Sequence, residues 1–208
     1  MIIAVDGPTA SGKGTIAKAL AAHFGLPHLD TGLLYRAVGW QVFLEGGNPD
    51  DGGDALAACG FPDGLLADPE LRTERVGGLA SRVSIHTGVR QALFERQRSF
   101  ATQEGGAVLD GRDIGTVIAP DAEVKLFITA STQARAERRW AEMRGRGQDV
   151  SLEDIVADLE ARDRRDRSRA VAPLAPAPDA QVIDTTALDR DQAIRFTIEA
   201  VETAIRGE

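Results

Sequence analysis

Residues 7–15 read GPTASGKGT and follow directly on IIAV, a short and fully apolar run at residues 2–5. The pattern G-x-x-x-x-G-K between a buried strand and a helix is typical of a phosphate-binding loop. Its glycines let backbone N–H groups point into one concavity, and the helix N-terminus adds partial positive charge there. A glycine turn that binds nothing is the alternative, but the strand, the spacing, the lysine and the helix together favour a phosphate site. The residues expected to cradle the phosphates of a nucleoside triphosphate are Gly7, Pro8, Thr9, Ala10, Ser11, Gly12, Lys13, Gly14 and Thr15.

The residues around the lysine of this loop indicate a class of enzyme. Lys13 can reach the β- and γ-phosphates, and it is followed by Gly14 and then Thr15. The hydroxyl that usually binds magnesium directly after the lysine is therefore displaced by one residue, to Thr15. Gly-Lys-Gly-Thr is typical of small kinases that phosphorylate nucleotides, whereas regulatory GTPases usually place Ser or Thr directly after the lysine.

Strands and helices alternate along the chain. Apolar runs predict strands at residues 2–5, 107–111, 124–128 and 180–184, with a further short strand in LPHLDTG, residues 26–32. Because the segments between them show helical spacing, we expect an α/β fold of the P-loop NTPase type. This fold has three layers, with a central parallel sheet of about five strands and helices on both sides.

The expected helices are placed by apolar spacing and by capping residues. The first covers residues 13–24, and others cover LRTERVGGLASRVS (71–84) and VRQALFERQRSFATQ (89–103). Ser131 is expected to cap a helix that runs into EMRGRGQD (142–149), a flexible basic loop. Apolar stripes are expected at Ile16, Leu20 and Phe24 in the first helix, and at Leu34, Val38 and Val42 in the next. The last helix has a stripe at Ile194, Ile198, Val201 and Ile205.

Composition limits the partners and the location of the chain. The net charge is −8, no apolar run approaches the ~20 residues of a membrane-spanning helix, and the N-terminus lacks the features of a signal peptide. Cys59 is the only cysteine, so no internal disulfide is possible. Residues 46–69 are rich in Gly, Asp, Ala and Pro and are expected to form a loop-rich insertion. We expect a cytoplasmic monomer that binds neither nucleic acid nor a membrane.

A charged segment, ARDRRDRSRAVAP at residues 161–173, stands out in this acidic chain. Ser151, with Asp154 as a capping box, is expected to start a helix whose apolar stripe continues at the same spacing into Arg162, Asp166 and Arg169. Charges on a core-facing line are costly unless they are paired or bind a ligand. A solvated helix end with ion pairs is one interpretation. A nucleic-acid-binding tract is less consistent with the aspartates, and a pocket in which arginines hold phosphate is the third.

Polar side chains also follow two of the expected strands, where ligands bind in open α/β sheets. LDGRDIG places Asp110, Arg112 and Asp113 just beyond one strand. Asp110 is a candidate for a water-mediated contact with Mg²⁺, and it could equally be a turn carboxylate.

The second such stretch is LDTGLLYR, residues 29–36. Asp30 or Thr31 could cap the next helix or contact a ligand, and Tyr35 could be a packing residue. Together with the phosphate loop, these residues and Arg36 predict one cleft at the sheet edge.

Five segments in order resemble bacterial cytidylate kinases: IAVDGPTASGKGT, LDTGLLYR, VRQALFERQRSFA, VLDGRDIGTVIAPDAEVKLFI and ARDRRDRSRAVAPL. The resemblance spans most of the chain, and DGRDIGTV together with RDRRDRSRAVAPL is its most specific part. It implies ATP-dependent phosphorylation of CMP and dCMP with Mg²⁺. It also implies a core (1–36, 105–137 and 170–208), an acceptor-binding lobe (about 37–104) and a lid (about 138–161).

The resemblance also implies roles for individual residues. Those expected to bind CMP are Thr31, Tyr35, Arg36, Ser81, Arg90, Arg112, Asp113, Arg162, Asp166 and Arg169. Within this set, Arg36, Arg112 and Arg169 are expected to bind the acceptor phosphate, with Thr31 near them. Arg162 and Asp166 are expected to bind the ribose, and Ser81, Arg90 and Asp113 to bind cytosine. The residues expected to be catalytic are Lys13, Arg112, Arg138, Arg139 and Arg169.

Arg138 and Arg139, with Arg144 and Arg146 nearby, resemble a mobile lid that closes on the ATP phosphates, and a solvated basic helix end is the alternative. Two other functions remain open from the residues alone. One is another small-molecule P-loop kinase, for UMP, AMP or shikimate. The other is a nucleotide-binding switch module that needs no acceptor.

Overall fold

The computed structural model describes residues 1–145 and 147–207. The chain divides into two compact units, one formed by Met1–Leu29 with Ala101–Glu208 and the other by Asp30–Phe100. Within the described residues, no helix has both the length and the apolar character that a membrane crossing requires.

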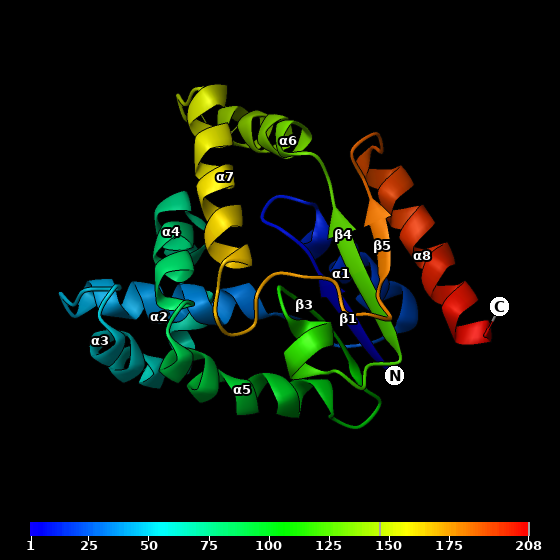
Figure 1. The fold of residues 1–208 in the computed structure, drawn as a ribbon, viewed down its shortest axis with the longest axis horizontal. Helices are drawn as coiled ribbons and strands as arrows, with labels where there is room; N and C mark the ends of the chain where they lie inside the picture. The colour runs from blue at the N-terminus through cyan, green and yellow to red at the C-terminus, as the bar shows by residue number, and fades with distance from the viewer. Residues whose placement is uncertain (146, 208) are drawn as a thin grey trace. The chain divides into compact units, whose positions relative to one another are not determined.

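The first unit is built on a five-stranded sheet, which confirms the expected α/β class (Figure 1). The order is β2-β3-β1-β4-β5, from β1 (Ile2–Asp6), β2 (His28–Asp30), β3 (Ala107–Gly111), β4 (Val124–Thr129) and β5 (Gln181–Asp184). β1 pairs in parallel with β3 and with β4, and β4 pairs in parallel with β5. Ile3, Ala4 and Val5 have no exposed surface, as expected for a central parallel strand covered on both faces.

One layer of helices covers a face of this sheet. α1 (Lys13–Phe24) and α8 (Arg190–Arg206) pack with the strands in one apolar cluster that includes Ile16, Leu20 and Val201. Val201 of the stripe expected on the last helix is buried, but the other buried positions are Ala193 and Thr197, each one residue before an expected isoleucine. Ile194 and Ile198 pack at the edge of the cluster, and Ile205 is exposed.

Two neighbouring helices, α6 (Thr132–Gly145) and α7 (Leu152–Arg167), form a second and smaller cluster in this unit (Figure 1). Ser131 caps α6 as expected, since its hydroxyl accepts from the Ala134 N–H. α6 continues to Gly145, so the start of the basic stretch expected as loop is helical. Ser151 caps α7, but its hydroxyl donates to the Asp154 carboxylate in place of the reciprocal capping-box bond.

The second unit is helical. It contains α2 (Thr31–Leu44), α3 (Gly52–Ala57), α4 (Glu74–Val83) and most of α5 (Thr87–Ala101), with three short 3₁₀ helices: η1 (Ala58–Gly60), η2 (Asp63–Ala67) and η3 (Pro69–Arg72). α2 and α4 approach so closely that a Cβ at Gly39 would lie 2.8 Å from the Leu79 Cβ.

The expectation of a loop-rich segment at residues 46–69 is wrong. Short helices there begin at carboxylate caps, Asp51 for α3 and Asp68 for η3, and the apolar residues that they bury are few: Ala55, Ala58 and Leu71. The Asp68 carboxylate also accepts from the Trp40 indole N–H, which ties the segment to α2. The Gly and Asp content reflects caps and turns between very short helices.

Candidate functional site

The phosphate-loop motif forms a tight turn between β1 and α1. A Cβ at Gly7 would lie 2.1 Å from the Ile128 carbonyl oxygen of β4, so only glycine lets the loop leave the sheet here. Gly12 has φ 87° and precedes α1, and Ala10 also has a positive φ, of 61°. Non-glycine residues in this region are uncommon and concentrate at functional sites.

The turn leaves the N-terminus of α1 open to a ligand. No side chain in the described chain caps α1 at Gly12, so no side-chain oxygen takes the place of a phosphate there. Lys13 Nζ reaches back over the loop to donate to the Pro8 carbonyl at 3.4 Å. The Ser11 hydroxyl is buried and has no hydrogen-bond partner among the described residues. The loop thus has the donors and the shape of an anion site.

A cavity of about 440 Å³ lies beside the loop, within the range of small-molecule sites. Three parts of the first unit line it: the phosphate loop with α1, then α6, and the β5–α8 connection with the start of α8. The lining residues are Ala10, Ser11, Gly12, Thr15, Ile16, Arg138, Arg139, Glu142, Thr185, Leu188, Asp189, Arg190 and Ala193. The last five lie in the β5–α8 connection and the first turn of α8, and the sequence provided no signal that they line a cavity.

The arginines expected to form a lid have different surroundings. Arg138 donates to the Thr185 hydroxyl at 3.1 Å, to the Thr185 carbonyl and to the Leu188 carbonyl at 3.2 Å, so it is anchored across the cavity rim. Arg139 pairs with Glu142, with nitrogen and oxygen 2.8 Å apart. Arg144 stacks on the Trp140 ring near the end of α6. Arg146 lies outside the described residues.

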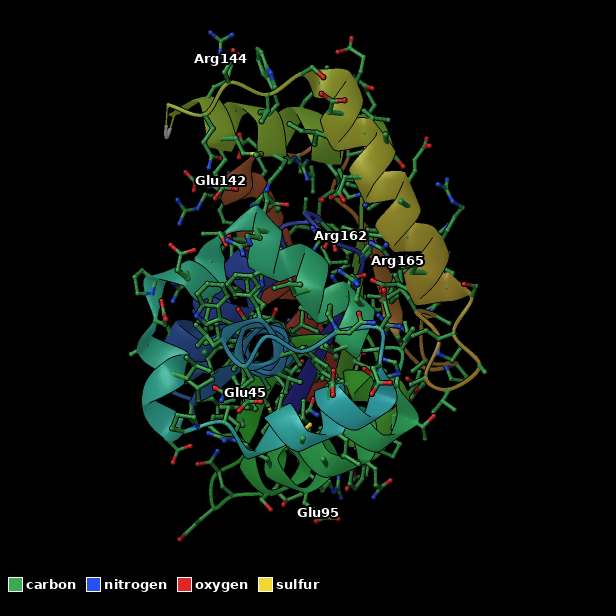
Figure 2. All side chains as sticks on the ribbon, turned by 90° about the vertical axis from the view of Figure 1, so that its left-hand side faces the viewer. Glu45, Glu95, Glu142, Arg144, Arg162 and Arg165 are labelled. Carbon is green, nitrogen blue, oxygen red and sulfur yellow. The ribbon has the colours of Figure 1, made fainter. Side chains whose placement is uncertain are left out.

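A second cationic cluster is centred on Asp166 of α7. Arg112 Nε donates to Asp166 Oδ2 at 2.9 Å, and Arg169 donates to Asp166 Oδ1. Arg162, one turn earlier, is buried, and Figure 2 labels it with Arg165 on α7.

The helical spacing predicted the burial of Arg162 and Asp166 correctly. However, α7 ends at Arg167, so Arg169 lies beyond the helix. Arg164 and Arg167 are exposed, as the interpretation of a solvated helix end expected for part of the tract.

Burial and neighbouring charges shift the pKa values of the residues in this cluster. Burial alone would raise the pKa of Asp166, but the positive charges of Arg112 and Arg169 lower it below its usual range. Burial lowers the pKa of Arg162, against the attraction of Asp158. Arg112 and Arg169 both bind the Asp166 carboxylate. The buried Arg162 pairs with Asp158, so three guanidinium groups gather in a poorly hydrated place. Such a site favours a bound anion.

Carboxylates at the carboxyl ends of β1 and β3 lie next to the phosphate loop. Asp110 Oδ1 is 2.7 Å from His28 Nε2, and its Oδ2 would lie 3.5 Å from a Cβ at Gly14. The pairing with His28 was not expected from sequence. Asp113 is buried at the start of η4 (Ile114–Ile118), a turn of π-helix.

The remaining predicted residues belong to the second unit. Asp30 caps α2 by accepting from the Leu33 N–H, so the alternative of Thr31 as the cap is not needed. Arg36 Nη1 donates to the carbonyls of Leu71 and Thr73, both at 2.8 Å.

The base-reading candidates of this unit are all buried. The Arg90 guanidinium lies 5.5 Å from the centroid of the Tyr35 ring, and Ser81 is buried on α4. Their roles toward a substrate remain predictions.

Comparison with known proteins places the chain in a family. The family model for cytidylate kinase matches residues 3–58 and 61–203. The chain belongs to the cytidylate kinase family. A cytidylate kinase of Xanthobacter autotrophicus is 55% identical over 208 residues, which is the full length of both chains. One of Cereibacter sphaeroides is 57% identical over 200 residues, 96% of this chain and 94% of that protein.

A solved structure supports the fold. An uncharacterized protein from Eubacterium ventriosum superimposes with a TM-score of 0.57 at 18% identity, over 98% of this chain and 99% of that one. At this identity the likeness concerns the fold alone. Family membership agrees with the motif resemblance, whose most specific parts surround Arg112 and Asp166.

Sequence reasoning missed a buried ion pair in this cytidylate kinase family member. Arg135 of α6 is 2% exposed, and its Nη2 lies 2.7 Å from Asp163 Oδ2 of α7. Asp163 sits one position beyond Arg162 in a run of charges, so periodicity alone did not separate it from its exposed neighbours. Arg135 had no signal beyond being a basic residue on an expected helix.

Asp6 at the end of β1 organises the turn that carries Asp113. Its two oxygens accept from the backbone N–H groups of Ile114 and Gly115, both at 2.8 Å. Burial raises the pKa of Asp6 to about 7, with the two backbone hydrogen bonds opposing the rise and the Asp113 charge adding to it.

This pKa predicts a pH dependence of stability. The folded protein holds a proton on Asp6 that the unfolded chain, with a pKa of 3.8, releases. The contribution of Asp6 to the free energy of unfolding is therefore fully present below about pH 4. It is lost as the pH rises through about 7. We expect the free energy of unfolding of the wild type, minus that of Asp6→Asn, to fall by on the order of a few kcal/mol between pH 5 and 8. Urea titrations at several pH values measure it, and a constant difference would contradict it.

Proposed function

We propose that this protein transfers the γ-phosphoryl group of ATP to the 5′-phosphate of CMP and of dCMP, giving ADP and the diphosphates. The observation that carries the proposal is the cluster of Arg112 and Arg169 on Asp166, connected through Arg112 to Thr9 of the phosphate loop. A loop for one polyanion and a cationic cluster for another, in direct contact, are what transfer between two phosphates needs.

We assign the donor to the phosphate loop and the cavity beside it. The backbone N–H groups at the start of α1 and Lys13 hold the β- and γ-phosphates. The nucleoside occupies the 440 Å³ cavity, whose walls offer apolar surface from Ile16 and Leu188. Arg138 and Arg139 lie at the edge of this cavity. They contact the ATP phosphates when the lid, about residues 138–161, closes over the donor.

The residues next to the loop fit a magnesium ion. Mg²⁺ prefers oxygen ligands and keeps several waters, so it needs few protein side chains. The Thr15 hydroxyl, next in the chain to Gly14, and the Asp110 carboxylate, whose Oδ2 would lie 3.5 Å from a Cβ at Gly14, would supply such oxygens. Among the described residues, no three His, Cys, Asp or Glu side chains gather as a metal cage. When bound, Mg²⁺ would neutralise charge on the β- and γ-phosphates.

The acceptor needs no general base. A phosphate monoester is mostly dianionic at neutral pH because its second pKa is about 6. One of its oxygens attacks the γ-phosphorus, the bond to the bridging oxygen breaks, and ADP leaves with the electron pair. The arginines reduce the repulsion between the two anions and stabilise charge on the transferring group. Arg36 of the acceptor lobe adds to this in our proposal, and Arg162 and Asp166 hold the ribose.

The substrate is tested by measuring ADP release with CMP, dCMP, UMP, AMP and shikimate as acceptors. We expect CMP and dCMP to give the highest kcat/KM. A preference for another acceptor would favour a different small-molecule kinase. ADP release without any acceptor would favour a nucleotide switch.

Asp113 is our candidate for reading the base, together with Ser81 and Arg90. Cytosine presents an amino donor where uracil presents a carbonyl acceptor, so a carboxylate attracts the first and repels the second. We expect Asp113→Ala to lower kcat/KM about 100-fold with CMP and less than about 10-fold with UMP. Steady-state kinetics with both acceptors measure this. Equal losses would mean that Asp113 supports the turn and does not read the base.

A further inference from the structure

Thr9 of the phosphate loop is held by two arginines from different parts of the first unit. Arg112 Nη2 donates to the Thr9 hydroxyl at 2.6 Å. Arg135 Nη1 donates to the Thr9 main-chain carbonyl at 3.0 Å. The side chain and the backbone of one residue therefore each accept a charged hydrogen bond, which is stronger than a neutral one.

Both arginines also donate hydrogen bonds to aspartates of the same helix, α7. Arg112 reaches Asp166 through Nε, and Arg135 reaches Asp163 through Nη1 and Nη2 at 3.2 and 2.7 Å. The two aspartates lie three residues apart on α7, so they are neighbours on its surface. The phosphate loop and α7 are thus joined at Thr9 by two parallel connections.

The two arginines differ in the number of N–H donors that remain available to a ligand. Arg135 is 2% exposed and also donates to the Ala130 carbonyl and the Thr132 hydroxyl, so its donors are committed to the protein. The Arg112 side chain is 22% exposed. Its hydrogen bonds to Thr9, Gly111 and Asp166 leave N–H donors of this guanidinium for other oxygens. Arg135 therefore fixes the backbone of Thr9, whereas the Arg112 guanidinium is accessible to a substrate.

We propose that the Thr9 hydroxyl is a positioning group for the acceptor: it fixes the Arg112 guanidinium, which in turn holds the acceptor phosphate. This rests on the role of Arg112 in the proposed function. The donor is held by backbone N–H groups and Lys13, which do not involve this hydroxyl. Loss of the hydroxyl should therefore affect the acceptor more than the donor, although Thr9 belongs to the donor loop.

The test compares Thr9→Val with Thr9→Ser. Valine keeps the shape of threonine and removes the hydroxyl, whereas serine keeps the hydroxyl. We expect Thr9→Val to raise KM for CMP about tenfold and KM for ATP by less than about twofold. Thr9→Ser should keep both KM values within about twofold of the wild type. Thermal unfolding of each variant separates this from a loss of stability, since a purely structural residue would not affect the two substrates unequally.

The inference is overturned if Thr9→Val leaves KM for CMP unchanged, if serine fails as valine does, or if both KM values rise together. Thr9→Ala removes the same hydroxyl without a branched side chain, and it replaces valine if that variant does not fold. The wild type in the same assay tests the proposed function separately. If the wild type uses another acceptor, the same comparison is made on the KM of that acceptor.

Discussion

Replacing Arg112 with glutamine is expected to lower kcat/KM for CMP by about three orders of magnitude. Glutamine keeps an N–H donor, but its side chain is shorter and lacks the charge and the planar fork that match phosphate oxygens. It also leaves Asp166 with one guanidinium fewer, so the pKa of this carboxyl, which Arg112 and Arg169 lower against burial, should rise. The loss of the charge and of the fork weakens the binding of the acceptor phosphate. Steady-state kinetics with CMP varied at saturating ATP measure the loss.

Arg164 offers a matched control on α7. Its side chain is 72% exposed, and a nitrogen of its guanidinium lies 3.8 Å from a Glu160 carboxylate oxygen. Arg164→Gln removes the same charge from the same chain and should keep kcat/KM within about twofold. Equal losses in the two variants would show that overall charge, and not the Asp166 cluster, attracts the acceptor. Full activity in Arg112→Gln would remove Arg112 from the mechanism.

Replacing Lys13 with glutamine is expected to lower kcat by about three orders of magnitude. Lys13 Nζ lies over the loop, 3.4 Å from the Pro8 carbonyl, where its charge can follow the β- and γ-phosphates. The loss should appear in kcat with both CMP and dCMP, because the donor side is common to them.

The control for Lys13 is Lys18→Gln, on the exposed side of the same helix. We expect normal kinetics from it. Circular dichroism of both variants should match the wild type, since neither lysine is buried. If Lys13→Gln turned over normally, the phosphate loop would not be the donor site.

The sequence was most informative where a physical rule links neighbouring residues. The run IIAV followed by G-x-x-x-x-G-K predicted β1, the loop and α1, because a buried strand, a glycine turn and a helix N-terminus must follow one another in a phosphate loop. Helical spacing from Ile155 and Leu159 predicted the burial of Arg162 and Asp166. These charged residues continue an apolar stripe, so the helical period predicts that they are buried.

The sequence was least informative where contacts join distant residues or where elements are very short. Arg135 and Asp163 are 28 residues apart, and nothing local marks them as a buried pair. The same holds for His28 and Asp110, 82 residues apart. The helices between residues 52 and 72 are too short to show a period, so their caps and glycines were interpreted as loop.

The most direct test of the central claim, that arginines in the first unit hold the acceptor by its phosphate, is a binding cycle without catalysis. Calorimetry gives Kd for CMP and for cytidine, which lacks the phosphate, with the wild type and with Arg112→Gln. We expect the wild type to bind CMP at least about 100-fold more tightly than cytidine, and the variant to lose at least about tenfold of that preference. An unchanged preference for CMP in the variant would contradict the assignment of Arg112 to the acceptor phosphate.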